Sequence, residues 1–104
     1  MRRRNPKWPL LIAICAVALP AAAQSPMPPS GRVLAASCSG CHGPGGHSPG
    51  AIPSIAGQSE SQLAKSLLDF KNDRREATVM NRHAKGFNDD EIAAIAREIS
   101  SQWR

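Results

Sequence analysis

The chain has 104 residues, with 13 Lys or Arg against 8 Asp or Glu, which gives a formal net charge of +5. Four of the basic residues and none of the acidic ones fall within the first 23 positions. Residues 24–104 therefore carry nine basic and eight acidic side chains, and this near balance gives no support to nucleic-acid binding. A segment of this size is one small domain, too short to build a large core from side chains alone.

The first 23 residues have the three parts of a secretory signal peptide. Four basic side chains precede an unbroken apolar run from Leu10 to Leu19, and Ala21, Ala22 and Ala23 supply the small side chains that a signal peptidase requires. The run is about half as long as a membrane-spanning helix, although an uncleaved signal would still tether the protein. We therefore predict a signal peptide at 1–23, export, and no membrane span in the mature chain.

The next segments are predicted to be a leader, a helix and a loop. Residues 24–30 contain three prolines and are expected to be an extended Pro-rich leader. Ser30 is a candidate N-cap for a helix whose apolar face includes Val33 and Leu34 and which leads into Cys38. From Gly40 to Gly50 the chain has five glycines and two prolines, so we expect a loop there.

The string Cys38-Ser-Gly-Cys41-His42 is the most informative motif of the chain. Two thiols separated by two residues can each add to one vinyl group of a porphyrin, while the adjacent imidazole is directed at the iron. In this interpretation Cys38 and Cys41 become thioethers, and His42 is the proximal ligand of one covalently bound haem c. Because haem is attached to such proteins after export in bacteria, the motif and the signal peptide together predict a periplasmic location.

A structural zinc site and a thioredoxin-like dithiol are the alternatives for the same string. A four-ligand zinc cage would need a second Cys or His pair, whereas His47 and His83 are isolated and Cys15 lies in the predicted signal peptide. A redox dithiol usually follows a strand, and nothing before Cys38 has the pattern of a strand. Haem attachment is the interpretation that the rest of the chain favours.

Two further helices are predicted from apolar residues at helical spacing. Ser59 and Gln62 form a capping-box pattern at the start of the second helix. Its buried stripe is expected at Leu63, Leu67 and Phe70. Asn88 is the candidate cap of the last helix, followed by acidic residues that suit the positive end of a helix dipole. The apolar face of that helix consists of Ile92, Ile95, Ala96, Ile99 and Trp103.

Residues 74–87, between the second and last helices, are expected to form a loop that carries Met80. We predict that Met80 is the sixth iron ligand, because a thioether is a soft, neutral donor that favours ferrous over ferric iron. The other methionines are the initiator and Met27 in the leader. His83, three residues beyond Met80, is the competing distal ligand. His47, in the glycine-rich loop, is expected to be a surface side chain.

Together these features resemble the class I c-type cytochromes over residues 31–103. That resemblance implies an all-α fold, with three to four helices packed around one covalently bound haem in a cytochrome c domain at 31–104. A narrower similarity is to the cytochrome subunit of flavocytochrome c sulfide dehydrogenase and to related dihaem periplasmic cytochromes. It is carried by Ser48-Pro-Gly-Ala-Ile-Pro-Ser-Ile-Ala-Gly57, by Asp69-Phe-Lys71, by Ala77-Thr-Val-Met80 and by Ala84-Lys-Gly-Phe87.

The resemblance also implies roles for particular residues. Cys38 and Cys41 would bind haem, His42 and Met80 would ligate iron, and the carbonyl of Pro53 would accept a hydrogen bond from the free nitrogen of His42. At position 83 the family usually has an apolar residue, so His83 is a departure from its pattern.

The function implied is electron transfer without catalysis on this chain. The protein would accept electrons from a sulfide-oxidising flavoprotein subunit and pass them to a soluble acceptor. Two other functions are left open, namely a stand-alone carrier for a terminal oxidase or reductase and a haem-based ligand sensor with a displaceable distal ligand. The basic residues that could contribute to docking near the haem edge are Lys65, Lys71, Arg74, Arg75, Arg82 and Lys85.

Overall fold

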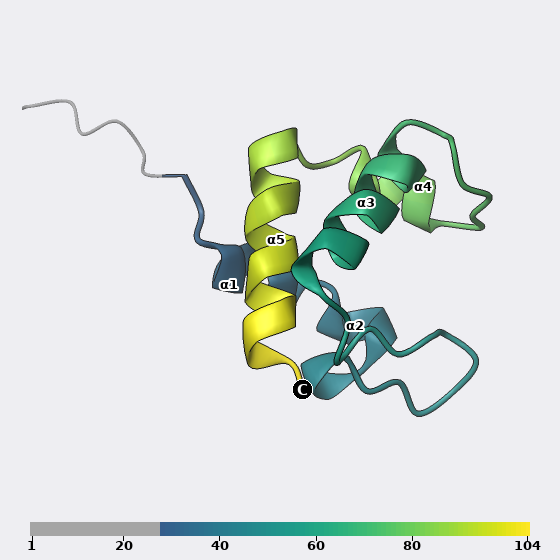
Figure 1. Cartoon of the computed structure of the whole chain (residues 1–104). Helices are drawn as coiled ribbons and strands as arrows, with labels where there is room; N and C mark the ends of the chain where they lie inside the picture. Colours follow the sequence, from purple (N-terminus) through teal and green to yellow (C-terminus); the bar gives the residue numbers. More distant parts are fainter. Residues whose placement is uncertain (1–27) are drawn as a thin grey trace, which may run out of the picture.

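The computed structural model describes residues 28–104, and all regular structure in this range is helical (Figure 1). The elements in chain order are α1 (Gly31–Ala36), α2 (Ser39–His42), the 3-10 turn η1 (Pro44–Gly46), α3 (Glu60–Lys71), α4 (Met80–Ala84) and α5 (Asp89–Gln102). The all-α prediction is confirmed, with more helices than the three to four expected. The predicted signal peptide (1–23) and positions 24–27 of the predicted leader lie outside the described residues.

The three predicted helix starts are confirmed by their caps. The Ser30 side chain accepts a hydrogen bond from the amide of Val33 at the start of α1. Ser59 forms a reciprocal capping box with Gln62 at the start of α3. Asn88 does the same at the start of α5. Side-chain oxygens here satisfy amide groups that have no partner inside the helix, and each such cap contributes about 1 kcal/mol.

Two short helices stand where loops were expected, so those predictions were wrong. The first, α2, lies inside the glycine-rich stretch, and the amide of His42 donates to the carbonyl of Cys38 over 2.9 Å. The second, α4, begins at Met80 inside the expected loop 74–87. Helices of four or five residues do not repeat an apolar face, so periodicity cannot reveal them, and their stability comes from tertiary packing.

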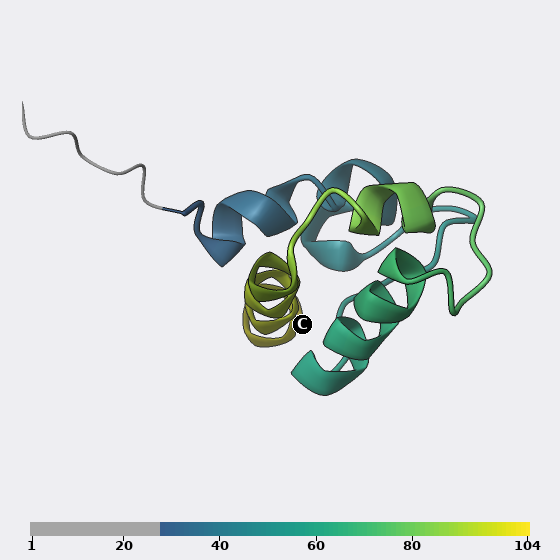
Figure 2. The same ribbon diagram turned by 90° about the horizontal axis from the view of Figure 1, so that it is seen from above.

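The core lies where α5 packs against both α1 and α3, as Figure 2 shows with α5 seen nearly end-on. Its buried members are Ala35, Leu63, Ile95, Ala96 and Ile99. The crossing of α1 and α5 is so close that a Cβ on Gly31 would lie 2.5 Å from the carbonyl oxygen of Ala94. A side chain larger than hydrogen at position 31 would therefore push the two helices apart.

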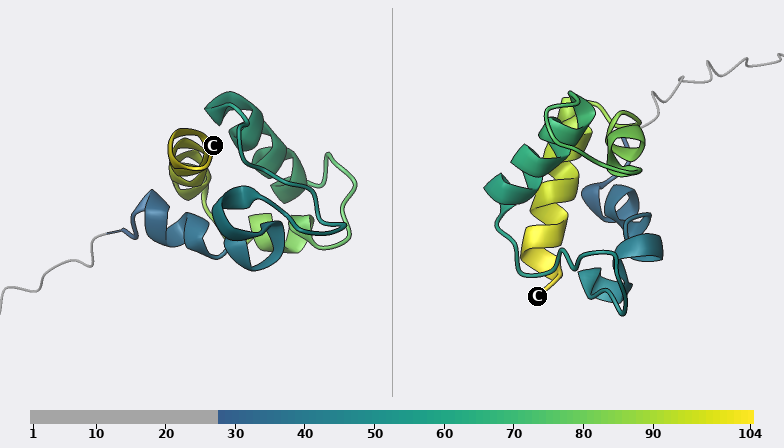
Figure 3. Two further views of the ribbon diagram at one scale, coloured as in Figure 1. Left: turned by 90° about the horizontal axis from the view of Figure 1, so that it is seen from below. Right: turned by 90° about the vertical axis from the view of Figure 1, so that its right-hand side faces the viewer.

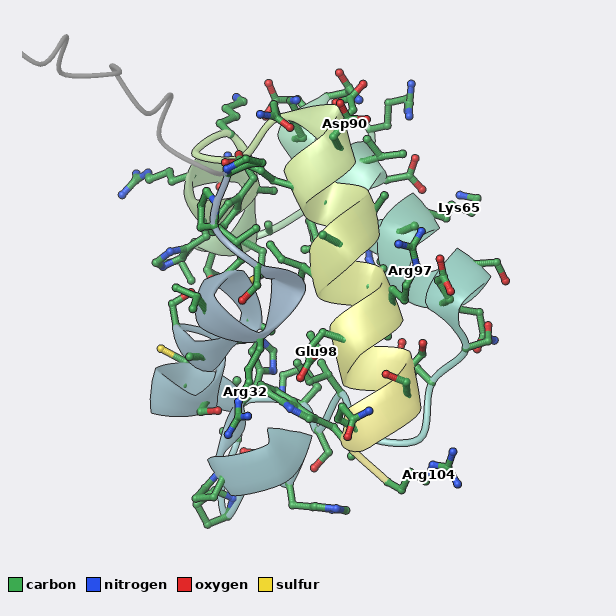
Figure 4. The ribbon with its side chains drawn as sticks, turned by 90° about the vertical axis from the view of Figure 1, so that its left-hand side faces the viewer. Arg32, Lys65, Asp90, Arg97, Glu98 and Arg104 are labelled. Atoms are coloured by element: carbon green, nitrogen blue, oxygen red, sulfur yellow. The ribbon has the colours of Figure 1, made fainter. Side chains whose placement is uncertain are left out.

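The two long loops, 47–59 and 72–79, project from the same side of the molecule, away from α1 (Figures 1 and 3). The face turned away from those loops is formed by α1, α5 and α3 and is covered by charged side chains. Figure 4 shows Arg32, Lys65, Asp90 and Arg97 on this face, and all four are exposed. Arg97 of α5 pairs with Glu60 of α3 at 3.5 Å. No helix within residues 28–104 is both long and apolar enough to cross a bilayer.

Candidate functional site

A mainly apolar cavity of about 320 Å³ lies between α2, the loop 51–53, α3, α4 and α5. Two of its walls, Leu67 and Ile95, are side chains that helical periodicity assigned to apolar helix faces. Ile52, Pro53 and Phe87 form further walls from segments outside the helices. All five predicted site residues line it, and so does His83; the five are Cys38, Cys41, His42, Pro53 and Met80.

His42 is held firmly at the end of α2. It is buried, with 7% of its surface exposed, and its Nδ1–H donates a hydrogen bond of 2.6 Å to the carbonyl oxygen of Pro53. A carbonyl can only accept, so the proton must be on Nδ1 and the lone pair on Nε2. The same bond orients the ring and strengthens the donor character of Nε2 toward a metal.

The two thiols lie at the start of α2: Cys38 is its N-cap, and Cys41 is its third residue. Cys38 is half-buried and Cys41 is exposed, and both are free. Burial raises the pKa of the Cys38 thiol, so this group is a neutral thiol at neutral pH. Within residues 28–104, no three His, Cys, Asp or Glu side chains converge as a metal site would require, which disfavours the zinc alternative.

The loop that brings Pro53 to His42 is fixed by backbone hydrogen bonds. The amides of Ile55 and Ala56 both donate to the carbonyl of Gly46, over 2.9 and 3.2 Å. The amide of Gly57 donates to the carbonyl of Trp103 over 3.0 Å, which joins this loop to the end of α5. The position of Pro53 therefore depends on main-chain contacts with distant parts of the chain.

Glycine is required at the turn that begins this loop. Gly43 has φ +85°, and a Cβ there would lie 1.9 Å from the carbonyl oxygen of His47. His47 is exposed, as expected, and its Nε2 hydrogen-bonds the carbonyl of Arg104 over 3.0 Å. Direct steric conflict and an unfavourable backbone conformation thus exclude a side chain at position 43.

Met80 is the first residue of α4, and His83 lies one turn further along the same helix. Both side chains line the cavity. Met80 is half-buried and His83 is exposed, so the histidine lies at the rim. The structure therefore brings both sequence-predicted candidates for the distal position to one cavity.

The loop before α4 is held by ion pairs that the sequence analysis did not find. Lys85, just after α4, contacts Asp73 at 2.6 Å, and Arg74 contacts Asp69 of α3 at 3.2 Å. We call these two pairs the distal ion pairs. Hydrogen bonds from Lys65 and Arg74 lower the pKa of Asp69, and the bond from Lys85 lowers that of Asp73. Acidic and basic residues occur throughout residues 60–104, so the sequence does not indicate which of them form these ion pairs.

Most of the basic residues considered for docking are already engaged within the protein. Lys65, Arg74 and Lys85 make the contacts just described, and Lys71 contacts Asp89 at 2.6 Å. Arg75 donates to the Ser66 hydroxyl over 2.9 Å, with its guanidinium 4.8 Å from the centre of the Phe70 ring. The contacts of Arg74, Arg75 and Lys85 tie the loop 72–79 to α3 and to the end of α4.

The residues around the cavity fit a covalently attached haem. His42 retains a free Nε2 lone pair because Nδ1 is committed to Pro53. A thioether sulfur, two free thiols at the attachment spacing and apolar walls share the same cavity. Imidazole and thioether are common axial ligands of haem iron, and paired thiols supply the attachment.

The fold and the cavity define a class of protein, the haem-binding electron carriers. The sequence model described as "Cytochrome c" matches residues 30–103, and the chain belongs to the cytochrome c family. Its cofactor is accordingly one covalent c-type haem.

Three relatives are similar to this chain over part of its length. The chain is 52% identical over 66 residues to the cytochrome subunit of sulfide dehydrogenase from Chlorobaculum tepidum, a match that covers 64% of this chain and 60% of that protein. It is 36% identical over 74 residues to cytochrome c4 of Pseudomonas aeruginosa, covering 70% of this chain and 37% of that protein. Identity to cytochrome c-554(548) of Halomonas halodenitrificans is 36% over 69 residues, covering 62% of this chain and 83% of that protein. The chain thus spans less than two thirds of the first two relatives.

Proposed function

We propose that this cytochrome is a one-electron carrier whose haem is bonded to Cys38 and Cys41 and whose iron is ligated by His42 and Met80. The observation that carries the proposal is the 2.6 Å hydrogen bond from His42 Nδ1–H to Pro53, because it leaves Nε2 as a donor in the cavity that Met80 also lines. No other imidazole of the described residues is both buried and hydrogen-bonded to a backbone carbonyl.

When bound, the haem supplies the one-electron couple between ferric and ferrous iron. The residues around the cavity would set the reduction potential of that couple. The Pro53 carbonyl orients His42 and increases its electron donation, whereas the soft thioether of Met80 favours the ferrous state. Leu67, Phe87 and Ile95 keep water from the cavity, so little solvent rearranges when the charge changes.

The ligand assignment is tested by optical spectra of the exported protein in both oxidation states. We expect the weak near-infrared band of thioether-to-ferric-iron charge transfer in the wild type and its loss in Met80→Ala. Met27→Ala is the matched control, since it removes a methionine from the leader and should leave the band unchanged. A band that survives in Met80→Ala would overturn the assignment of Met80.

We further propose that the protein is exported to the periplasm and accepts electrons there from a sulfide-oxidising flavoprotein. Support comes from the signal-peptide pattern at 1–23 and from the similarity to the Chlorobaculum tepidum subunit. Mass spectrometry of the periplasmic fraction should find a mature chain beginning near Gln24 and carrying one haem. A full-length chain in the cytoplasm would contradict the location.

A stand-alone soluble carrier is the second candidate, favoured by the 83% coverage of the Halomonas halodenitrificans cytochrome. Purification of the tagged protein from its natural host separates the two. A flavoprotein that co-elutes at a fixed ratio and reduces the haem on addition of sulfide supports the subunit role. A free monomer, reduced only by other donors, supports the stand-alone carrier.

A further inference from the structure

We propose that His83 is a reserve distal ligand that takes the iron position whenever the Met80 thioether leaves it, preferentially in the ferric state. The proposal rests on the His42 and Met80 ligation proposed above. It concerns what this chain does when its first distal ligand is lost.

The placement of His83 is the first observation. Met80 and His83 are three residues apart on α4, so they lie on neighbouring positions of one helix face. Both line the cavity that also receives His42. A side chain at this position can thus approach the same space as the Met80 sulfur without any change of helix.

The second observation is that the His83 ring has no competing commitment among the described residues. Among the described residues, the ring of His42 is hydrogen-bonded to the carbonyl of Pro53, and the ring of His47 to the carbonyl of Arg104. His47 is not among the residues that line the cavity. Lys85, which follows α4, is paired with Asp73. Of the cavity-lining residues, His42 and His83 are those with an imidazole, and His42 occupies the proximal side.

The third observation is that few local interactions stabilise α4, although its Ala84 is buried. The helix has five residues, and its N-cap Val79 provides no side-chain hydrogen bond. The amides of Arg82 and His83 share the carbonyl of Val79, over 3.0 and 3.2 Å. So short a helix has little stability of its own, and its position depends on packing and on the exposed contact between Lys85 and Asp73.

The chemistry sets the preference between oxidation states. Ferric iron is the harder acceptor and favours imidazole nitrogen over thioether, whereas ferrous iron favours the softer sulfur. In the exchange the iron–sulfur bond breaks with its electron pair remaining on Met80, and a lone pair of a ring nitrogen of His83 forms the new bond. No electron is consumed, so the exchange needs no further reactant.

The test compares ferric Met80→Ala with the double variant Met80→Ala, His83→Ala at one pH by electron paramagnetic resonance and optical spectroscopy. We expect Met80→Ala to lose the near-infrared band yet remain low-spin, because His83 binds. The double variant should become high-spin and return to low-spin when free imidazole is added, which shows that its cavity is intact. His47→Ala combined with Met80→Ala is the matched histidine control and should stay low-spin.

A high-spin Met80→Ala, or a low-spin double variant, would overturn the role of His83 while leaving the Met80 assignment in place. The Met80 assignment fails separately, if the near-infrared band survives Met80→Ala. Should Met80→Ala not retain haem, mild heating of the ferric wild type and of His83→Ala provides the same comparison. On loss of the band the wild type should stay low-spin and His83→Ala should become high-spin, and equal behaviour of the two would overturn the proposal.

Discussion

The two sides of the cavity are held by different kinds of interaction. On the His42 side, main-chain hydrogen bonds and the partly buried bond from His42 to Pro53 join the loop 43–57 to α2 and to the end of α5. On the Met80 side, the loop 72–79 and α4 are held in part by the distal ion pairs, in which Arg74, Lys85 and Asp73 are exposed and Asp69 is mostly covered. Hydrogen bonds between amides and carbonyls involve no net charge and no titrating group, so salt and pH affect them little, whereas exposed ion pairs are weakened by both. The proximal side therefore serves as a fixed support and the distal side as the adjustable one.

The largest expected effect comes from breaking the proximal support with Gly43→Ala. The new Cβ would collide with the carbonyl of His47, and the positive φ would strain the backbone. We expect a loss of about 3 kcal/mol or more in the free energy of unfolding, measured by chemical denaturation. Gly50→Ala, in the same loop and with open space around its Cβ, is the control and should be close to neutral.

The shared core should follow in size. Ile95 is 1% exposed and both fills the helix core and lines the cavity. Ile95→Ala should cost about 2–5 kcal/mol through lost burial and the space left behind. Denaturation followed at the haem and by circular dichroism should shift together, because this residue serves both sides. Separate transitions would show that the two sides unfold independently.

The distal ion pairs should have little effect on global stability and a clear effect on Met80. In Lys85→Gln the contact with Asp73 is lost, so α4 is less firmly held. We expect the near-infrared band to disappear at a lower temperature than in the wild type, and added salt to reduce that difference by screening the wild-type pair. Arg97→Gln breaks an ion pair on the face away from the loops and should leave the band unchanged.

Acid provides the mildest change. Lys65 and Arg74 lower the pKa of Asp69, and Lys85 lowers that of Asp73. A carboxyl whose pKa is lower in the folded state stabilises that state above its unfolded pKa of about 3.9, and this contribution is lost as the pH falls through the folded value. Below about pH 4 the near-infrared band should therefore weaken before the far-UV circular dichroism does. Simultaneous loss of the two signals would argue against a separately weakened distal side.

Sequence patterns were informative where structure follows from local rules. The caps at Ser59 and Asn88, the apolar stripe of α5 and the Cys38–His42 string all depend on spacing along one segment. Of the stripe expected to be buried on α3, Leu63 is buried, whereas Leu67 and Phe70 are half-buried. The helix α4 was missed because five residues carry no periodic signal. Its end at Lys85 is fixed by Asp73, a contact that depends on how the loop folds back.

The same distinction applies to the site. The side chains that line the cavity could be named from motif and resemblance, and the structure places them together. The Pro53 carbonyl that accepts from His42 was named from the resemblance, but the bonds from Ile55 and Ala56 to Gly46 that hold its loop could not be named, because they involve only backbone atoms. Any sequence can make such bonds, so only the folded chain shows which residues do. His83 could be named from the sequence as a second candidate ligand because it follows Met80 by three residues.

The close crossing of Gly31 and Ala94 has a consequence for how quickly the domain forms. It joins the first helix to the last, so nearly the whole domain must be enclosed as one large loop before the core is complete. Closing such a loop costs chain entropy in advance of the contacts that compensate for it, which slows folding. Haem bonded immediately after α1 gives the later helices a nearby apolar surface on which to collect. We therefore expect stopped-flow refolding to be slower without attached haem than with it.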